Sequence, residues 1–319
     1  MTSAVTEKHS NALVERKFND PKWTLDGESR AVVTLNRLET LWFNTGTLCN
    51  LSCSNCYIES SPTNDRLSYL TAAEVAGTLD ELQADWQARE VGFTGGEPFM
   101  NPEILNMVGD TLARGYRALI LTNAMRPMMK LSDELLSLRW RYGDQLCLRV
   151  SVDHYAPKVH ELERGEHAWR RMMEGLVWLV ENSFNITIAG RTLSGEDETR
   201  LRQGYANFFK THAIPVNSDN PAELVLFPEM DESLDVPEIT SACWEILNVS
   251  PDAMMCATSR MVAKHKDDQG LTVMPCTLLP YDERFKMGPT LAASKSPVSL
   301  NHPHCARFCV LGGGSCSAS

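Results

Sequence analysis

Short apolar strands alternate with amphipathic helices along most of the 319-residue sequence, and this pattern constrains the fold more than any other feature. The strands are predicted at 41–44, 90–94, 118–122, 146–153, 184–190 and 223–227, and the intervening helices at 70–87, 102–114, 132–140, 167–181 and 196–211. About six such units predict βαβ connections and a parallel, curved sheet. Six units are too few for a closed eight-stranded barrel. Periodicity alone fits a partial barrel or an open doubly wound sheet.

Composition and charge exclude several classes of protein. Hydrophobic residues make up 43% of the chain and charged residues 22%, which is enough apolar material for a sizeable core. The formal net charge of −11 disfavours binding to nucleic acid, because phosphate neutralisation needs a basic excess. No apolar run is long enough for a membrane span, and residues 1–20 lack the apolar stretch of an export signal. We therefore expect a cytoplasmic protein without membrane or nucleic-acid partners.

Three of the ten cysteines, Cys49, Cys53 and Cys56, form a C-x3-C-x2-C motif directly after the first predicted strand. Loops at that end of a parallel barrel carry active sites. Three thiolates at this spacing can hold three irons of a 4Fe–4S cluster and leave the fourth iron open. Zinc or unliganded cysteines are the alternative, but structural zinc usually needs a fourth protein ligand.

The motif and its position resemble the radical S-adenosylmethionine (SAM) enzymes. The resemblance implies a partial (β/α)6 barrel in which the open iron binds SAM. Reductive cleavage of SAM then yields a 5′-deoxyadenosyl radical that abstracts hydrogen from a C–H bond. One departure is visible, because many members carry an aromatic residue just before the third cysteine, where this chain has Asn55, followed by Tyr57 after Cys56.

The same resemblance assigns SAM contacts to residues near the ends of the later strands. Gly95-Gly96-Glu97-Pro98 resembles the segment that holds the amino group of SAM. A T-N pair ends the third strand, and an S-x-D pattern ends the fourth strand. In the family, an arginine that follows the fourth strand pairs with the carboxylate of SAM. The predicted cofactor contacts are Tyr57, Gly95, Gly96, Glu97, Asn123, Ser151, Asp153, Arg164 and Gly190. No general acid or base is assigned.

Six of the ten cysteines fall within the last 77 residues. The order C-x13-G-x5-C at Cys256 and Cys276, followed by Cys305, Cys309 and Cys316, resembles the SPASM/Twitch extension of radical SAM enzymes, although the second spacer is one residue longer. This implies one auxiliary 4Fe–4S cluster held by four of these five cysteines. Zinc, with His302 and His304 nearby, is the alternative. Cys147 and Cys243 are expected to be buried residues rather than ligands.

These observations predict an N-terminal lead-in at 1–37, a radical SAM partial barrel at 38–235 and an auxiliary-cluster domain at 236–319. The predicted function is a radical SAM oxidoreductase that receives its electron from a flavodoxin or ferredoxin. A small-molecule substrate is slightly favoured, because 37 residues are too few for a peptide-recognition domain ahead of the barrel. A peptide- or protein-modifying maturase comes close behind. A non-catalytic redox sensor or a zinc protein is the alternative of another class.

Overall fold

The computed structural model describes residues 17–192, 195–229 and 235–313. Its centre is an eight-stranded sheet with the order β7-β6-β5-β4-β3-β2-β8-β9, and β1 pairs separately with β10. The strands are β1 (Val32–Val33), β2 (Thr40–Asn44), β3 (Glu90–Thr94), β4 (Arg117–Thr122), β5 (Leu146–Ser151), β6 (Asn185–Thr192), β7 (Leu224–Pro228), β8 (Ser259–Ala263), β9 (Thr272–Met274) and β10 (Val298–Ser299).

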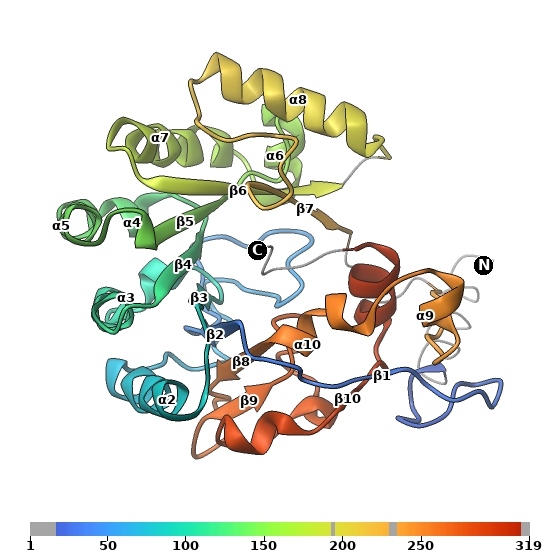
Figure 1. The fold of residues 1–319 in the computed structure, drawn as a ribbon. Helices are drawn as coiled ribbons and strands as arrows, with labels where there is room; N and C mark the ends of the chain where they lie inside the picture. Colours follow the sequence, from blue (N-terminus) through green and yellow to red (C-terminus); the bar gives the residue numbers. More distant parts are fainter. Residues whose placement is uncertain (1–16, 193–194, 230–234, 314–319) are drawn as a thin grey trace.

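Helices cover the outer face of the sheet between β2 and β7, as Figure 1 shows. They are α2 (Ala72–Asp85), α3 (Ile104–Ala113), α4 (Arg126–Met129), α5 (Ser132–Tyr142), α6 (Pro157–Arg164), α7 (Ala168–Glu181) and α8 (Glu198–Thr211). The C-terminal region adds α9 (Cys243–Ile246), α10 (Met255–Thr258) and a π-helical turn, η6 (Cys305–Leu311). Strands β2 to β7 are all parallel, so the architecture is a partial (β/α)6 barrel.

The six strands predicted from the sequence are all present, and none of their ends differs from the prediction by more than two residues. Thr71 caps α2 as predicted, and its side chain and that of Glu74 form a reciprocal capping box. The fourth strand ends at Ser151 rather than 153, so Asp153 lies in the loop beyond it. Helix α6 was not predicted, and Arg164 is its last residue.

The sequence shows no strand–helix pattern beyond residue 236, but the structure has further strands there. Strand β8 follows α10 and pairs in parallel with β2, and β9 then pairs antiparallel with β8. The C-terminal region therefore extends the barrel sheet, and β10 also pairs with β1 near the start of the described chain. Short strands among Pro, Gly and Ser carry little periodicity, which is why the sequence did not predict them. The domain boundaries at 37 and 235 stay a prediction.

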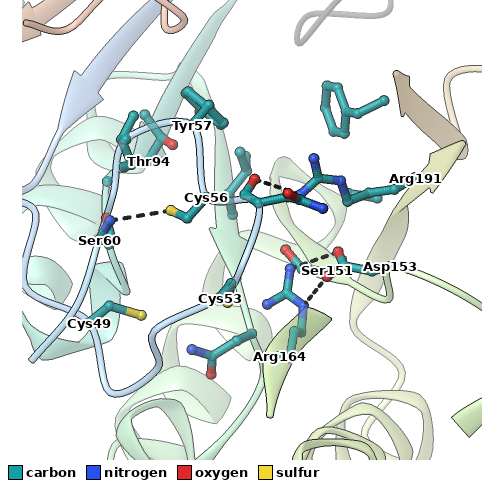
Figure 2. A pocket seen from close by; sticks show the side chains of 18 of the residues that line it. Cys49, Cys53, Cys56, Tyr57, Ser60, Thr94, Ser151, Asp153, Arg164 and Arg191 are labelled. Atoms are coloured by element: carbon teal, nitrogen blue, oxygen red, sulfur yellow. Dashed lines mark hydrogen bonds and ion pairs between the residues drawn. The ribbon is translucent and has the colours of Figure 1, made fainter. Parts of the chain in front are cut away.

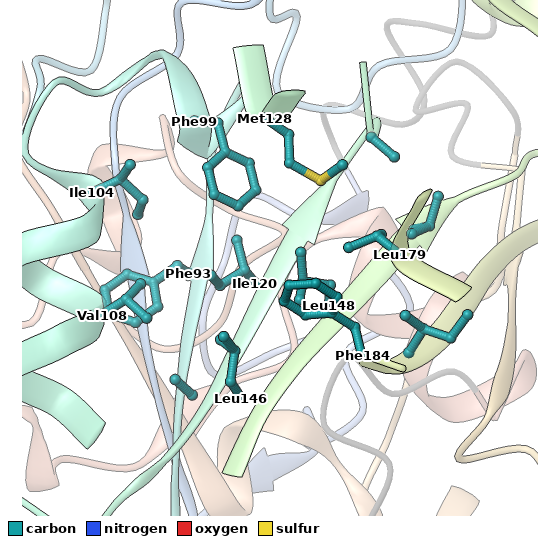
Figure 3. Close-up of a cluster of buried hydrophobic side chains, with 14 of the residues drawn as sticks. Phe93, Phe99, Ile104, Val108, Ile120, Met128, Leu146, Leu148, Leu179 and Phe184 are labelled. Carbon is teal, nitrogen blue, oxygen red and sulfur yellow. The ribbon is translucent and has the colours of Figure 1, made fainter. Parts of the chain in front are cut away.

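Two apolar clusters occupy the two faces of the sheet. Alternate side chains of each strand, such as Ile120 and Leu148, pack against the helices, and Figure 3 shows this cluster. The other face points into the barrel, where Trp42 lies so close to Gly92 that an added Cβ would sit 2.3 Å from its ring. Within the described residues no helix combines the length and apolarity that crossing a membrane requires.

Candidate active site

A cavity opens at the carboxyl ends of the parallel strands, and we name it the strand-end cavity. It encloses about 1060 Å³ including its open mouth, comparable with large small-molecule sites. Eleven of the twelve residues predicted for the catalytic cluster and SAM line it: Cys49, Cys53, Cys56, Tyr57, Gly95, Gly96, Asn123, Ser151, Asp153, Arg164 and Gly190. Figure 2 shows the three cysteines on one side and the charged residues Asp153, Arg164 and Arg191 on the other.

Backbone amides surround the cysteine thiols. The amide of Leu51 donates to Cys49 Sγ at 3.4 Å, and the amide of Ser60 donates to Cys56 Sγ at 3.3 Å. Burial raises the pKa of Cys49 to about 12 and also raises the pKa of Cys53. The thiols of Cys49 and Cys53 therefore keep their protons near neutral pH, and iron binding must displace those protons.

Gly95 and Gly96 fit the backbone of the cysteine loop. The amide of Gly96 donates to Gly46 O at 2.9 Å, and the amide of Glu97 donates to Leu48 O at 3.1 Å. A Cβ on Gly96 would lie 2.2 Å from Leu48 O, and Gly95 has a φ of +133°. Two glycines are thus required to hold the start of the loop, in addition to any approach of a ligand.

The far end of the cysteine loop is fixed to α6 and β6. Asn55 Nδ2 donates to Glu163 Oε2 at 2.8 Å, and the amide of Ser54 donates to Glu163 O at 2.9 Å. Arg191 Nη1 donates to Asn55 O at 2.7 Å. Asn55, which replaces the aromatic residue common in the resembling family, therefore joins the loop to the helix that carries Arg164.

Asp153 and Arg164 form a buried, two-pronged ion pair. Arg164 Nε donates to Asp153 Oδ2 at 2.7 Å, and Arg164 Nη2 donates to Asp153 Oδ1 at 2.9 Å. Burial alone would raise the pKa of Asp153, but the charge and hydrogen bonds of Arg164 outweigh it and the pKa is lowered. Arg164 thus already has one carboxylate partner, and three N–H bonds, two on Nη1 and one on Nη2, are left to donate to a ligand.

Glu97 is the predicted contact that does not line the cavity. Its carboxylate accepts from Thr122 Oγ1 and from the amide of Asn123, both at 2.8 Å, and so connects the ends of β3 and β4. Burial raises its pKa to about 7. Gly190 also lines the cavity. It has to be a glycine because a Cβ at this position would lie 2.4 Å from the hydroxyl oxygen of Tyr205.

A second cavity gathers cysteines that are far apart in the sequence, and we name it the C-terminal cysteine cavity. Cys256, Cys276, Cys305 and Cys309 line it, mostly with Met, Leu, Val and Pro side chains. Burial raises the pKa of Cys256 to about 11 and that of Cys305 well above its usual value, and nearby Cys276 adds to the latter shift.

The remaining candidates of this region are placed as follows. His304 lines the C-terminal cysteine cavity. His302 is also buried, and its ring packs against the ring of His304 with centroids 4.8 Å apart. Cys316 lies outside the described residues. Cys243 lines neither cavity and is half-buried, so the expectation that it is buried is wrong, whereas Cys147 is a buried strand residue inside the barrel as expected.

Each of the two sets of cysteines lines a cavity. Among residues 17–192, 195–229 and 235–313, no three His, Cys, Asp or Glu side chains converge on a single metal position. A 4Fe–4S cluster binds each thiolate through a different iron, so it needs cysteines around a common space rather than around one point. Three thiols on one loop, and four around an apolar cavity, match that requirement.

Sequence reasoning missed part of the cavity wall. Phe227 and Phe308 stack with ring centroids 5.6 Å apart, and both line the strand-end cavity with Leu278. No local pattern could reveal a contact between residues so distant in sequence. Arg191, which follows Gly190 in β6, lines the cavity too, and its buried Nε has no hydrogen-bond partner among the described residues.

The family model of the radical SAM superfamily matches residues 43–202, half of the chain. The chain therefore belongs to the radical SAM superfamily, whose members are enzymes that use a 4Fe–4S cluster and SAM. Membership of this superfamily argues against the two alternative functions, a non-catalytic redox sensor and a zinc protein.

Solved structures show a similar fold over most of the chain. Streptococcus suis SuiB bound to S-adenosylmethionine is 13% identical with a TM-score of 0.58, covering 82% of this chain and 64% of that one. Native anSMEcpe with bound AdoMet is 12% identical with a TM-score of 0.58, covering 84% and 82%. These likenesses extend beyond the family match into the C-terminal region.

Two curated relatives share shorter stretches. The subtilosin biosynthesis protein AlbA of Bacillus subtilis is 32% identical over 117 residues, covering 37% of this chain and 25% of the relative. The GTP 3′,8-cyclase of Tolumonas auensis is 29% identical over 131 residues, covering 40% and 37%. The chain thus matches only a quarter to about two-fifths of their length.

Proposed function

We propose that this chain is a radical SAM oxidoreductase that oxidises a C–H bond of a substrate bound in the strand-end cavity. The observation that carries the proposal is the joint lining of one cavity by three cysteines of a single loop and by the buried pair of Asp153 and Arg164. When bound there, the cluster and SAM supply the electron transfer and the radical that abstracts hydrogen.

The residues of the cavity bind, orient and exclude water. Cys49, Cys53 and Cys56 would hold the cluster, and Arg164 would offer its Nη1 N–H bonds to the carboxylate of SAM while Asp153 fixes its orientation. Ser151 supplies a hydroxyl for the ribose, in line with its inward position at the end of β5. Phe227, with its stacked neighbour and Leu278, forms an apolar wall that keeps water away from a reactive intermediate.

We further propose that the four cysteines of the C-terminal cysteine cavity would hold an auxiliary 4Fe–4S cluster, which would supply an acceptor for the electron that leaves an oxidised substrate. Leu278 lines both cavities, so a single side chain separates them at that point. Four cysteines are enough to ligate every iron of such a cluster. Full ligation favours electron acceptance over substrate anchoring, which would need an open iron.

Two substrate classes follow from different observations. A small molecule is the first candidate, because the strand-end cavity has a volume comparable with large small-molecule sites. A peptide is the second candidate, because the similar fold of Streptococcus suis SuiB was solved with the precursor peptide SuiA and that of anSMEcpe with the Kp18Cys peptide. Oxidised products of synthetic peptides and of small molecules, detected by mass spectrometry with the reconstituted enzyme, distinguish the two.

The central test is formation of 5′-deoxyadenosine by the anaerobically reconstituted chain with dithionite and SAM. We expect slow formation without substrate, loss of formation in Cys56→Ala, and retention in Cys243→Ala, a matched cysteine that lines neither cavity. Equal activity in Cys56→Ala and the parent chain would contradict the proposed role of the loop.

Metal analysis tests the auxiliary cluster. We expect about eight irons per chain in the parent protein and about four in Cys276→Ala, because a 4Fe–4S cluster needs its Cys thiolates. Four irons together with one zinc in the parent protein would instead assign the C-terminal cysteine cavity to zinc.

A further inference from the structure

A third hollow lies on the outer side of the cysteine loop, and we name it the basic groove. Its walls come from the loop after β2, the short 3-10 helix η1 (Pro98–Met100), α4 and α7. The lining residues used here are Asn50, Phe99, Met125, Arg126, Lys130 and Arg171. It shares no lining residue with the strand-end cavity, so both can be occupied together.

The charge of the groove is opposite to that of the chain. Arg126, Lys130 and Arg171 are all exposed, and none of them forms an ion pair with another described residue. No Asp or Glu lines the groove. A chain with a net charge of −11 repels an acidic partner over most of its surface, but attracts one here.

The floor of the groove is apolar and lies next to the catalytic cysteines. Phe99 and Met125 are 5% and 2% exposed and form part of it. Asn50 is exposed in the groove, whereas the preceding residue, Cys49, is buried and lines the strand-end cavity. Asn50 Oδ1 accepts from Asn123 Nδ2 at 3.0 Å, and Asn123 lines that cavity. One layer of residues therefore separates groove and cavity.

We propose that the basic groove is the docking site of an acidic one-electron carrier protein of the flavodoxin or ferredoxin kind. The proposal rests on the proposed function, which consumes an electron from outside the chain. The carrier is oxidised by one electron and the cluster at Cys49, Cys53 and Cys56 is reduced by one, and no bond forms or breaks in that step. An apolar floor ringed by cations suits a weak, salt-sensitive encounter of this type.

The test compares a protein reductant with one that needs no docking site. The variant R126E/K130E/R171E reverses the three charges, and calorimetry measures its binding to flavodoxin at low ionic strength. We expect Kd to weaken by about tenfold or more, and 5′-deoxyadenosine formation driven by reduced flavodoxin to slow by a similar factor. Formation driven by dithionite stays within about twofold of the parent rate, because dithionite does not use the groove.

The variant R141E/R200E/K210E is the matched control, since it changes net charge equally at exposed positions outside the groove. We expect it to bind flavodoxin almost as well as the parent chain. An equal loss in the control, an unchanged Kd in the groove variant, or an equal loss with dithionite would each overturn the proposal.

Calorimetry also separates this proposal from the proposed function. A parent chain that forms no 5′-deoxyadenosine with dithionite contradicts the function, whereas its binding to flavodoxin still reports on the groove. If the groove holds a second copy of the chain, the parent protein elutes as a dimer and the groove variant as a monomer. That result, with unchanged flavodoxin binding, also contradicts docking of a carrier.

Discussion

The two cysteine cavities of this protein differ in chemistry although Leu278 lines both. The strand-end cavity combines cysteines with a buried ion pair, a second arginine and backbone groups from several strand ends. The C-terminal cysteine cavity is lined by cysteines, His304 and apolar side chains, without a charged Asp, Glu, Lys or Arg among its lining residues. The first cavity is therefore suited to bind and release polar molecules, and the second to retain a group that does not exchange.

This difference assigns separate tasks to two sets of cysteines. Polar groups are kept in the strand-end cavity at a cost in desolvation, which is expected where a ligand must be oriented. Apolar side chains around thiolates limit the access of solvent and so influence the redox potential of a bound cluster, but they offer no polar group to a substrate. The following predictions test the comparison, from the largest expected effect to the smallest.

Removal of one cysteine from each cavity should have unequal effects on SAM cleavage. We expect Cys53→Ala to lower 5′-deoxyadenosine formation by at least roughly 100-fold, because loss of a metal ligand exceeds the effect of an outer contact. Cys305→Ala should stay within about threefold of the parent in the absence of substrate. Chromatographic quantification of 5′-deoxyadenosine measures both, and equal losses would remove the distinction between the cavities.

The buried ion pair of the strand-end cavity should be costly to break. Arg164→Ala leaves the carboxylate of Asp153, 5% exposed at its side chain, without its partner. We expect the free energy of unfolding to fall by about 3–5 kcal/mol in urea titrations. The double variant with Asp153→Ala should recover part of this loss, while Arg141→Ala, at an exposed position, should change little. A double variant less stable than Arg164→Ala would contradict the explanation.

The folded state around α6, the helix that carries Arg164, should lose stability in acid. His160 on α6 is fully buried, and neither ring nitrogen has a hydrogen-bond partner among the described residues. Burial, with a smaller contribution from the charge of Arg164, lowers its pKa from 6.5 to about 4. The unfolded chain therefore binds a proton at higher pH than the folded chain does. The resulting stability is complete above pH 6.5 and is lost as the pH falls toward 4.

We expect this histidine to account for about 3 kcal/mol of the acid-induced loss of unfolding free energy. His160→Leu should remove that part of the pH dependence in urea titrations between pH 7 and pH 4. His212→Leu, at an exposed position, is the control and should leave the pH dependence unchanged. A parent-like slope in His160→Leu would show that other groups cause the loss.

The hydrogen bond between Asn55 and Glu163 should contribute least. Asn55→Ala removes the 2.8 Å contact that joins the cysteine loop to α6, at a cost of about 1 kcal/mol. We expect iron release to a chelator to accelerate by roughly fivefold, as followed by absorbance. Glu163→Gln keeps an acceptor for Asn55 and should behave like the parent chain. Faster release in Glu163→Gln than in Asn55→Ala would indicate a role for charge rather than for this contact.

Local features of the sequence predicted the catalytic half of the molecule well. The strand positions, the Thr71 cap and the loop that carries the first three cysteines depend on contacts within one strand–helix unit. Glu97 shows the limit of that reasoning. Its place beside two glycines marked it as a ligand contact, but its side chain connects two strand ends behind the cavity. The orientation of the Glu97 side chain is set by its hydrogen-bond donors at the end of the neighbouring strand, β4.

The sequence by itself determined the barrel's strand–helix order and the cysteine motif, because periodicity and spacing are local properties. The tertiary structure alone decided that β8 joins β2 and that Phe227 stacks on Phe308. It also decided that cysteines from α10 to the π-helical turn η6 surround one apolar cavity. The basic groove likewise needs four separate segments to meet: the loop after β2, η1, α4 and α7. Such contacts join segments that share no repeat or motif, so only the packing of the whole chain brings them together.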